Sequence, residues 1–404
     1  MSVTSARGPD FGFPEDSAFG LETCADTASL LARERPAEPV YCVYPEIYRE
    51  QAAAFVAGFP GHVLYAVKAN DHPAVIRLLN QGGVTHFDCA SLAEIEQVRG
   101  LCPDAHCYFM IPVRPRGAAR SAFENFGVRH FVIDHTAGLD LLADQVPLEE
   151  VVVFTRMAVS HEAALQNLST KFGAPPESVP GLMEAVADRG AEAALAFNVG
   201  SSVTRPEAYE YAMEVAQTVL NRLPFRVRLV DVGGGFPRSY PGFRVPPLED
   251  YFDSIRNMSA RLPLADDGAI LAEPGRALAA PGLSAVVEVL LRKDDRLYLN
   301  DGMFGIFWEL RFKGHDRYPV RVFRDGSSHS GDTRQFSLYG PTCDSTDVLP
   351  GRVPLPADIR PGDHLEFGSL GAYSLAGRTR FNGFYSERVV LLTAPDARPP
   401  GQAN

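Results

Sequence analysis

The sequence predicts an α/β protein in which a closed (β/α)8 barrel is followed by a second, mostly β domain. Between about residues 60 and 275, eight short apolar runs alternate with longer segments of helical spacing, which is the pattern of repeated βα units. From about residue 281 the apolar runs continue, with few helical segments between them. An open, doubly wound sheet is the alternative for the first region, but eight strands over this length favour the barrel.

The barrel strands are predicted from apolar runs that are rich in β-forming residues. Helices are expected between them where apolar residues recur at helical spacing. The predicted strands are His62–Val67, Val84–Phe87, His106–Met110, Arg129–Ile133, Val151–Phe154, Ala194–Phe197, Arg226–Val230 and Ala269–Ala272. The predicted helices include Pro73–Asn80, Leu92–Arg99, Gly181–Asp188, Pro206–Leu220 and Leu248–Leu262.

The second domain is predicted from alternating apolar runs. The first 40 residues show no clear helix and are expected to pair back onto this domain, whereas the Pro- and Gly-bearing end of the chain is expected to be disordered. The predicted strands are Ser284–Leu291, Leu297–Leu299, Val320–Phe323, Phe336–Leu338, His364–Phe367 and Arg388–Leu392. The predicted units are therefore residues 1–40, the barrel 41–280, the β domain 281–395 and the tail 396–404.

Composition and charge exclude several classes of protein. The chain has 404 residues and a net charge of −12 without any basic stripe, which disfavours nucleic acid as a partner. No apolar run reaches the roughly 18 residues of a membrane span. The N-terminus lacks the apolar core of a signal peptide, so a cytoplasmic location is expected. The six cysteines form no CxxC pair, so neither a disulfide framework nor a metal site is expected.

Polar residues follow several predicted strands, where a barrel of this type carries its reactive side chains. The first strand leads to Lys68, the second to Asp88 and the fifth to Arg156. Lys68 is either a surface lysine whose stem lies along apolar residues or a desolvated amine that can form a Schiff base. Asp88 precedes a predicted helix, so it is either one of the acids at a helix start or a site residue, and both roles are compatible.

Glycine-rich segments follow the seventh and eighth predicted strands. Gly233, Gly234 and Gly235 lie in the run DVGGGFP, and Glu273 precedes Gly275 and Arg276 in EPGRAL. These glycines match no complete dinucleotide or P-loop pattern. Their position is informative, because the loops after strands seven and eight often bind phosphate in this fold, and glycine lets backbone N–H groups approach an anion closely.

These features together describe a site for pyridoxal 5'-phosphate (PLP). Lys68 would hold the aldehyde, while the glycines and Arg276 would hold the phosphate. A carboxylate at Glu273 would keep the pyridine nitrogen protonated and make the ring a strong electron sink. Because a protonated ring stabilises the carbanion left by loss of CO2, Glu273 favours decarboxylation over racemisation.

Several further motifs occur in a characteristic order between about residues 40 and 392. With them, the chain resembles the fold-type III PLP-dependent decarboxylases, and within these the ornithine and lysine decarboxylase group. That family has an alanine-racemase-like barrel with a β domain and is typically a homodimer whose active sites lie at the interface. The motifs are YAVKAN, FDCASLAEIE, LSTKFGA, NVGSS, DVGGGFP, EPGRAL, NDGMFG, YGPTCDSTD and GAYSLAGRTRFNGF.

The resemblance implies a role for each matching residue. Lys68 would bind the cofactor covalently and Glu273 would pair with its ring nitrogen. Asp88, Arg156 and Asn198 would line the cofactor site. The residues implied to hold the phosphate are Ser201, Gly233, Gly234, Gly235, Gly275, Arg276 and Tyr373.

The resemblance also implies a substrate end of the site that the partner subunit contributes. Cys343 would protonate the carbanion after CO2 leaves, and Asp344 would meet the distal end of the substrate. Phe381 and Asn382 would line the pocket from the same side as Tyr373. The alternative for Cys343 is a buried, apolar cysteine, which is the commoner state of a free thiol.

Two positions depart from the family pattern. Asn198 stands where the family commonly has a histidine stacked on the cofactor ring, and an amide offers no aromatic stacking. Lys313 aligns with an aspartate of ornithine decarboxylases. A cation there would disfavour a diamine product and favour a substrate with an acidic or acylated end. Alternatively, Lys313 points outward and Asp344, with Asp347, suffices.

The expected function is PLP-dependent decarboxylation of a basic amino acid, L-ornithine or L-lysine. Lys313 keeps open a decarboxylase of an acylated, citryl-conjugated or diacid amino acid, as in siderophore-type pathways. A racemase of the same fold and a non-catalytic regulatory paralogue are further alternatives. The paralogue is disfavoured because Lys68, Glu273, Arg276 and Cys343 are all present, although Asn198 keeps it open.

Overall fold

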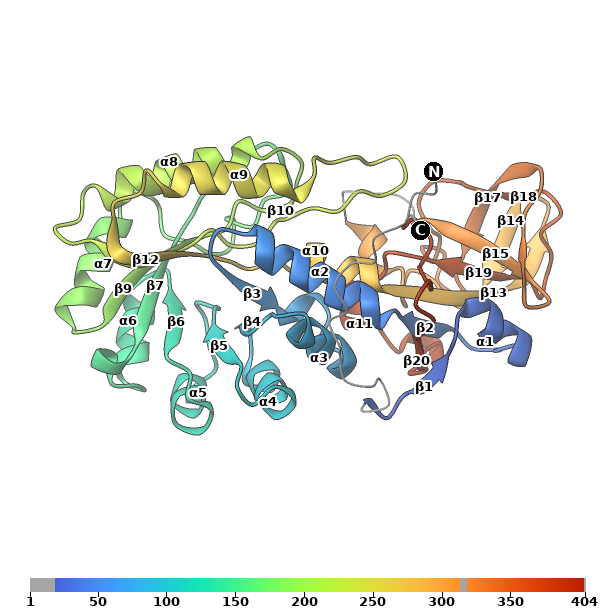
Figure 1. Ribbon diagram of the computed structural model, residues 1–404, viewed down its shortest axis with the longest axis horizontal. Coiled ribbons are helices and arrows are strands. Elements are labelled where there is room, and N and C mark those ends of the chain that lie inside the picture. The colour runs from blue at the N-terminus through green and yellow to red at the C-terminus, as the bar shows by residue number, and fades with distance from the viewer. Residues whose placement is uncertain (1–18, 313–317, 403–404) are drawn as a thin grey trace, which may run out of the picture.

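The structure is a computed structural model that describes residues 19–312 and 318–402. Lys313, for which the sequence predicts a role in substrate choice, lies outside the described residues. Figure 1 shows an elongated molecule with a barrel at one end, a β domain at the other, and the long helix α2 (Pro45–Gly58) between them. The cofactor site predicted from the sequence lies at the carboxyl ends of the barrel strands.

Eight parallel strands close into a barrel, which confirms the predicted fold class over the open sheet. The strands pair in the order β11-β12-β3-β4-β5-β6-β7-β9. Every strand predicted for this region is present. The bounds are β3 (His62–Ala66), β4 (His86–Cys89), β5 (His106–Phe109), β6 (His130–Ile133), β7 (Val152–Met157), β9 (Glu192–Phe197), β11 (Val227–Asp231) and β12 (Leu264–Ala272).

Side chains alternate between the interior of the barrel and the helices around it, as the two-residue period of a strand requires. Leu64, Val132, Phe154 and Leu271 belong to one buried cluster inside the barrel. Their neighbours along the strands, such as Tyr65, belong to the larger core beneath the helices. The barrel is therefore a packed core, and ligands can enter only at its ends.

Helices cover the barrel, including the five that the sequence predicts. A capping box starts α4: the Ser91 hydroxyl accepts a hydrogen bond from the Glu94 N–H, and the Glu94 carboxylate accepts one from the Ala90 N–H. This cap fixes the chain just after Asp88. The helices are α3 (Pro73–Gln81), α4 (Leu92–Leu101), α5 (Ala118–Phe126), α6 (Thr136–Ala143), α7 (Val179–Asp188), α8 (Glu207–Leu220) and α9 (Leu248–Ser259).

The β domain is a sheet with strand order β1-β20-β2-β13-β14-β17-β18, to which β15, β16 and β19 are added. All six strands predicted here are present. The bounds are β1 (Glu22–Cys24), β2 (Val40–Val43), β13 (Leu283–Lys293), β14 (Arg296–Leu299), β15 (Val320–Arg324), β16 (Ser327–His329), β17 (Thr333–Tyr339), β18 (Val353–Pro356), β19 (His364–Phe367) and β20 (Val389–Leu392).

The N-terminal segment pairs back onto this sheet, since β1 runs parallel to β20. The expectation of no helix in the first 40 residues is wrong, because α1 spans Thr27–Arg33. Asp26 caps this helix by accepting a hydrogen bond from the Ser29 N–H, and Leu30 and Leu31 are buried. A helix of seven residues, about two turns, with two apolar anchors is too brief to give a clear helical period in sequence.

The tail differs from the prediction of disorder between residues 396 and 402. Pro399 and Pro400 are buried, and the Gln402 side chain donates a hydrogen bond to the Pro281 carbonyl at 3.1 Å. Proline loses little chain entropy when it is ordered, so a Pro-rich tail can pack onto a surface at low entropic cost. Residues 403 and 404 lie outside the described residues.

Among the described residues, we find no helix with the length and apolar character needed to cross a membrane.

Four neighbouring barrel strands begin with histidine: His62, His86, His106 and His130. The His62 and His86 rings are 5.0 Å apart, and the His86 and His106 rings are 4.9 Å apart. Burial, together with these neighbouring imidazoles, lowers the pKa of His86 and His130 to about 4. The amino end of the barrel therefore tolerates neutral histidines better than charged ones.

We predict that this row of histidines destabilises the fold in acid. Unfolded His86 and His130 bind protons near their ordinary pKa of 6.5, whereas the folded chain resists protonation until about pH 4. Stability is thus lost as the pH falls from about 6.5 to 4, by on the order of 2 kcal/mol for each histidine. Urea unfolding at several pH values measures this loss.

The double variant His86→Asn, His130→Asn is expected to flatten the pH dependence of unfolding in that window. The matched control is His161→Asn, because His161 lies apart from the row and contacts Tyr211 instead. An unchanged slope in the double variant would contradict the prediction.

Candidate active site

Lys68 and Asp88 form an ion pair at the carboxyl end of the barrel. Lys68 lies in the short 3-10 helix that follows β3, and Asp88 lies in the adjacent strand β4. The Lys68 Nζ donates to Asp88 Oδ2 at 2.5 Å. Desolvation favours the neutral amine, but the negative charges of Asp88 and Glu273 outweigh it and raise the pKa of Lys68. The ion pair thus opposes the neutral form that desolvation alone would favour, and attachment of a cofactor at Lys68 stays a prediction.

Three carboxyl groups meet beside this lysine. Asp231 ends β11, and Glu273 follows β12. The two carboxyl groups affect each other's pKa, and the charge of Asp88 raises the pKa of both. Burial, and then the nearby negative charges, raises the pKa of Glu273 well above its usual range. Burial raises the pKa of Asp231 to about 7, although the Gly233 N–H donates to its carboxylate at 2.7 Å. Arg156, in β7, offsets part of this negative charge.

Some buried polar atoms in this group have no partner among the described residues, namely Asp88 Oδ1, Asp231 Oδ2 and Arg276 Nε. A buried polar atom without a hydrogen bond costs about 1–3 kcal/mol. Such atoms are retained where a ligand satisfies them. The unpartnered atoms thus mark this end of the barrel as a binding site for a polar group.

The glycines of the DVGGGFP loop are required by close packing. Gly233 and Gly235 have φ values of 73° and 104°, a region that favours glycine. A Cβ at Gly234 would lie 2.7 Å from the Glu273 carbonyl oxygen, and one at Gly235 would lie 2.6 Å from the Gly200 carbonyl oxygen. The loops after β9, β11 and β12 are therefore drawn together by residues without side chains.

Arg276 lies beside this loop and is held on two of its edges. One guanidinium nitrogen forms an ion pair with buried Glu309, and another donates to the Tyr240 hydroxyl at 3.2 Å. The guanidinium carbon is 5.3 Å from the centre of the Tyr373 ring. These contacts orient Arg276, and its Nε is the edge that stays unpartnered among the described residues.

The sequence reasoning missed Glu309. The available signal was a single acid within the aromatic and apolar run GIFWELRF, where a buried carboxylate needs a cationic partner.

Asn198 lies on the loop that follows β9, and Ser201 begins β10 (Ser201–Val203). The Asn198 side-chain oxygen accepts a hydrogen bond from the Gly200 N–H at 2.9 Å, so it builds this turn. Gly200 itself has a φ of 125°, and a Cβ there would lie 2.6 Å from the Gln166 carbonyl oxygen, so this position requires glycine. Asn198 therefore builds the turn after β9, although a histidine can make the same contact, since the His161 ring nitrogen accepts a hydrogen bond from the Ala163 N–H at 3.1 Å.

Most of the predicted cofactor residues line one pocket. Three predicted residues do not line it: Asp88, Arg156 and Gly233. Asp88 is nevertheless hydrogen-bonded to Lys68, and the charge of Arg156 acts on Glu273. Gly233 directly precedes the glycines that line the pocket. The pocket is lined by Ala66, Lys68, Leu168, Asn198, Gly200, Ser201, Ser202, Gly234, Gly235, Phe236, Glu273, Gly275, Arg276 and Tyr373.

The residues predicted to meet the substrate lie elsewhere. Asp344 lines a second pocket with Leu290, Leu291 and Phe384, and this pocket shares no lining residue with that of Lys68. Cys343 is exposed, so the alternative of a buried apolar cysteine is wrong. Within one chain the structure thus separates Cys343 and Asp344 from Lys68.

The segment around Cys343 is held by two polar side chains. The Cys343 N–H donates to Asn382 Oδ1 at 3.2 Å, and Phe381, beside Asn382, stacks on Phe304 with ring centres 4.6 Å apart. The buried Asp347 carboxylate accepts hydrogen bonds from the Met303 N–H and the Thr342 hydroxyl, both at 2.7 Å. Asp347 therefore holds the loop in place, and it lines the same pocket as Asp344.

The chemistry of the Lys68 pocket fits PLP. It combines an amine, a carboxyl group of raised pKa, an oriented guanidinium with one free edge, and glycines whose backbone can approach a phosphate. The residues that would hold the phosphate are those of the Gly233–Gly235 loop with Arg276 and Tyr373.

Comparison with known proteins gives a consistent result. The family model described as "Pyridoxal-dependent decarboxylase, pyridoxal binding domain" matches residues 46–280. The chain is 33% identical to a lysine/ornithine decarboxylase of Selenomonas ruminantium over 82% of this chain and 83% of that protein. It is 32% identical to Antizyme inhibitor 2 of Xenopus laevis, over 80% of this chain and 74% of that protein.

Solved structures resemble the whole fold. A lysine/ornithine decarboxylase from Vibrio vulnificus, complexed with putrescine, has a TM-score of 0.76 and 28% identity over 88% of this chain and 94% of that chain. An arginine decarboxylase of Paramecium bursaria Chlorella virus, bound to agmatine, has a TM-score of 0.80 and 26% identity over 90% of this chain and 98% of that chain.

We predict that Glu309→Gln lowers stability because it leaves the buried Arg276 guanidinium without its counter-charge. Loss of one partner of a buried ion pair costs about 3–5 kcal/mol. Added PLP is expected to raise the melting temperature of the variant more than that of the wild type, since its phosphate restores a negative charge beside Arg276. Thermal unfolding with and without PLP measures both effects.

The control for this experiment is Glu249→Gln, in the exposed first turn of α9. It is expected to unfold like the wild type. Equal responses of the Glu309→Gln protein and the wild type to PLP would show that Glu309 does not act through Arg276.

Proposed function

The chain belongs to the pyridoxal-dependent decarboxylases, and we propose that it uses PLP to decarboxylate a basic amino acid, L-ornithine or L-lysine, to the diamine and CO2. The observation that carries this proposal is the contact between Lys68 and Asp88 in a pocket that also contains Glu273 and the glycine loop. PLP, when bound, supplies the electron sink that accepts the electron pair left by the departing carboxylate.

The residues of the barrel have distinct proposed roles. Lys68 is the attachment point for the cofactor, and Asp88 receives or returns a proton at Lys68 Nζ, 2.5 Å away. Glu273 is the proposed partner of the pyridine nitrogen, and burial, with the neighbouring negative charges, raises its pKa and so favours sharing a proton with that nitrogen. Arg276, oriented by Glu309, and the glycine loop position the phosphate.

We further propose a homodimer in which each active site combines residues of two chains. Cys343, the proposed proton donor, and Asp344, the proposed contact for the substrate ammonium, line a region apart from Lys68 in one chain. Large apolar side chains are exposed around them, including Leu290 and Phe384. Apolar exposure of this kind is typical of an interface, and a two-fold dimer would build two equivalent sites.

The substrate class follows from the charge near Asp344 and from the relatives. Proteins similar to this chain are named as decarboxylases of lysine, ornithine or arginine. An acid at the distal end of the pocket suits a substrate ammonium or guanidinium. Hydrogen bonds from Thr346, with a smaller contribution from Arg311, lower the pKa of Asp344 and so favour the charged carboxylate that such a contact requires.

The proposed location is the cytoplasm. All six cysteines lie among the described residues and are unpaired, as is typical of a reducing compartment.

We predict that the PLP-loaded protein converts L-ornithine to putrescine, L-lysine to cadaverine, or both. The test supplies L-ornithine, L-lysine, L-arginine, diaminopimelate and N-acetyl-ornithine separately and identifies the amine by mass spectrometry. Lys68→Ala is the control and is expected to show no product. Turnover of only the acylated or diacid substrate would favour the alternative substrate class, and no turnover of any would favour a regulatory protein.

We predict that mixing two inactive variants, Lys68→Ala and Cys343→Ala, restores activity. Random exchange of subunits makes about half of the dimers mixed, and each mixed dimer has one complete site, so about one quarter of the wild-type activity is expected. Decarboxylation before and after subunit exchange measures this. No recovery in a mixture that exchanges subunits would contradict the shared site.

A further inference from the structure

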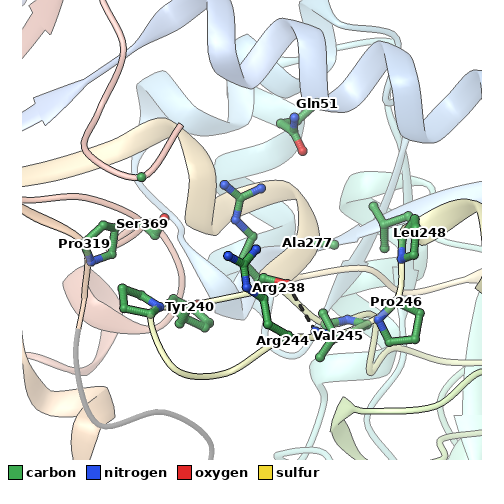
Figure 2. Close-up of a pocket in the computed structure, with 15 residues that line it drawn as sticks. Gln51, Arg238, Tyr240, Arg244, Val245, Pro246, Leu248, Ala277, Pro319 and Ser369 are labelled. Carbon is green, nitrogen blue, oxygen red and sulfur yellow. Dashed lines mark hydrogen bonds between the residues drawn. The ribbon is translucent and has the colours of Figure 1, made fainter. Parts of the chain in front are cut away.

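A third cavity, of about 650 Å³, lies between the barrel and the β domain and includes neither Lys68 nor Asp344. Its walls come from the loop between β11 and α9, from α2 through Gln51, from α10 (Arg276–Ala279) through Ala277, and from the β domain through Pro319 and Ser369. Figure 2 shows the cavity and its lining side chains. Its volume falls within the range of pockets that hold small organic ligands.

The charge of this cavity is one-sided. Arg238 and Arg244 line it, and none of its described lining residues is Asp or Glu. Figure 2 shows both side chains on the same side of their loop, extending toward Gln51. Like charges held close together repel each other unless an anion lies between them.

Arg238 has the features of a ligand-binding residue. Its Nε is buried and has no hydrogen-bond partner among the described residues, and neither Arg238 nor Arg244 forms an ion pair there. Arg276, which donates a hydrogen bond to the cavity-lining Tyr240, is by contrast paired with Glu309. Burial lowers the pKa of Arg238, and no carboxylate among its described neighbours offsets this. A guanidinium kept in this state is suited to binding carboxylate or phosphate.

The remaining walls supply hydrogen-bond donors and a rigid frame. The Ser239 hydroxyl oxygen accepts a hydrogen bond from the Val245 N–H at 3.2 Å, which leaves its own O–H able to donate. Gln51 adds an amide donor. Apolar contacts come from residues that include several prolines, which lose little freedom when a ligand binds. These residues are Pro237, Pro241, Val245, Pro246, Pro247, Leu248, Ala277 and Pro319.

We propose that this cavity is a binding site for a small organic anion with phosphate or carboxylate groups, and that Arg238 and Arg244 are its main ligands. The site is separate from the proposed catalytic pocket, with which it shares no lining residue. It therefore adds a function to the one proposed above and does not depend on which amino acid is decarboxylated.

The cavity is connected to the cofactor site through one loop. Arg238 follows the Gly233–Gly235 loop in sequence, and Tyr240, which lines the cavity, accepts a hydrogen bond from Arg276. Ala277, on the opposite wall, is adjacent to Arg276 in α10. An anion bound between these walls would bias the loop that positions the cofactor phosphate, so the site is a place for an effector.

The experiment measures anion binding to the PLP-loaded protein, in which the cofactor's own phosphate group covers the catalytic phosphate site. Isothermal titration calorimetry is performed with pyrophosphate and, separately, with citrate. The variants are Arg238→Gln, Arg244→Gln and the double variant, and the matched control is Arg222→Gln, an exposed arginine outside the cavity. Circular dichroism and the melting temperature establish that each variant is folded.

We expect pyrophosphate, citrate or both to bind the wild type and the Arg222→Gln protein equally. Each cavity variant is expected to lose about 10-fold or more in affinity, as befits the loss of a charge-assisted hydrogen bond. Binding of one probe alone distinguishes a phosphate ligand from a carboxylate ligand and supports the site. No binding of either probe to the wild type, or unchanged binding to the folded double variant, would overturn the proposal.

Discussion

The active end of the barrel depends on one electrostatic constraint, the meeting of three carboxyl groups at the ends of adjacent strands. Asp88, Asp231 and Glu273 are brought together because parallel barrel strands end on the same face. In a buried setting such a group cannot be fully ionised. Lys68 compensates Asp88 directly, and the raised pKa of Glu273 is a consequence of burial and of the same crowding. The local chemistry therefore originates in strand topology.

Arg276 and Arg238, both near this site, differ in whether the protein supplies a counter-charge among the described residues. This difference separates the cofactor site from the cavity that contains Arg238. Arg276 has a fixed counter-charge in Glu309, so its direction is set by the protein. Arg238 has no such partner among the described residues, so its direction and charge are available to a ligand. Because the β11–α9 loop carries Arg238 and also contacts Arg276 through Tyr240, the two regions are mechanically linked.

The sequence predicted the barrel because its strands are short, apolar and evenly separated, and local pattern carries that information. It failed where tertiary contacts decide. Helix α1 is too short to show a period, the tail is ordered by packing against Pro319 and Gly368, and the raised pKa of Lys68 depends on carboxylates from other strands. The glycines at strand ends were informative, because their position along the chain already indicates a phosphate site. Glu309 pairs with Arg276, which is distant in sequence, so the sequence alone does not indicate its partner.

In the proposed dimer the chemistry and the choice of substrate are carried by different parts of the chain. The barrel supplies Lys68 and Glu273, whose properties follow from crowded strand ends. Asp344 lies on a loop of the β domain that Asp347 fastens to Met303. Because the loop is held by contacts that do not involve the barrel strands, its side chains can change without altering the carboxyl cluster. In the proposed dimer, one catalytic end would therefore serve amino acids with different distal groups, and the loop, not the barrel, would determine the substrate.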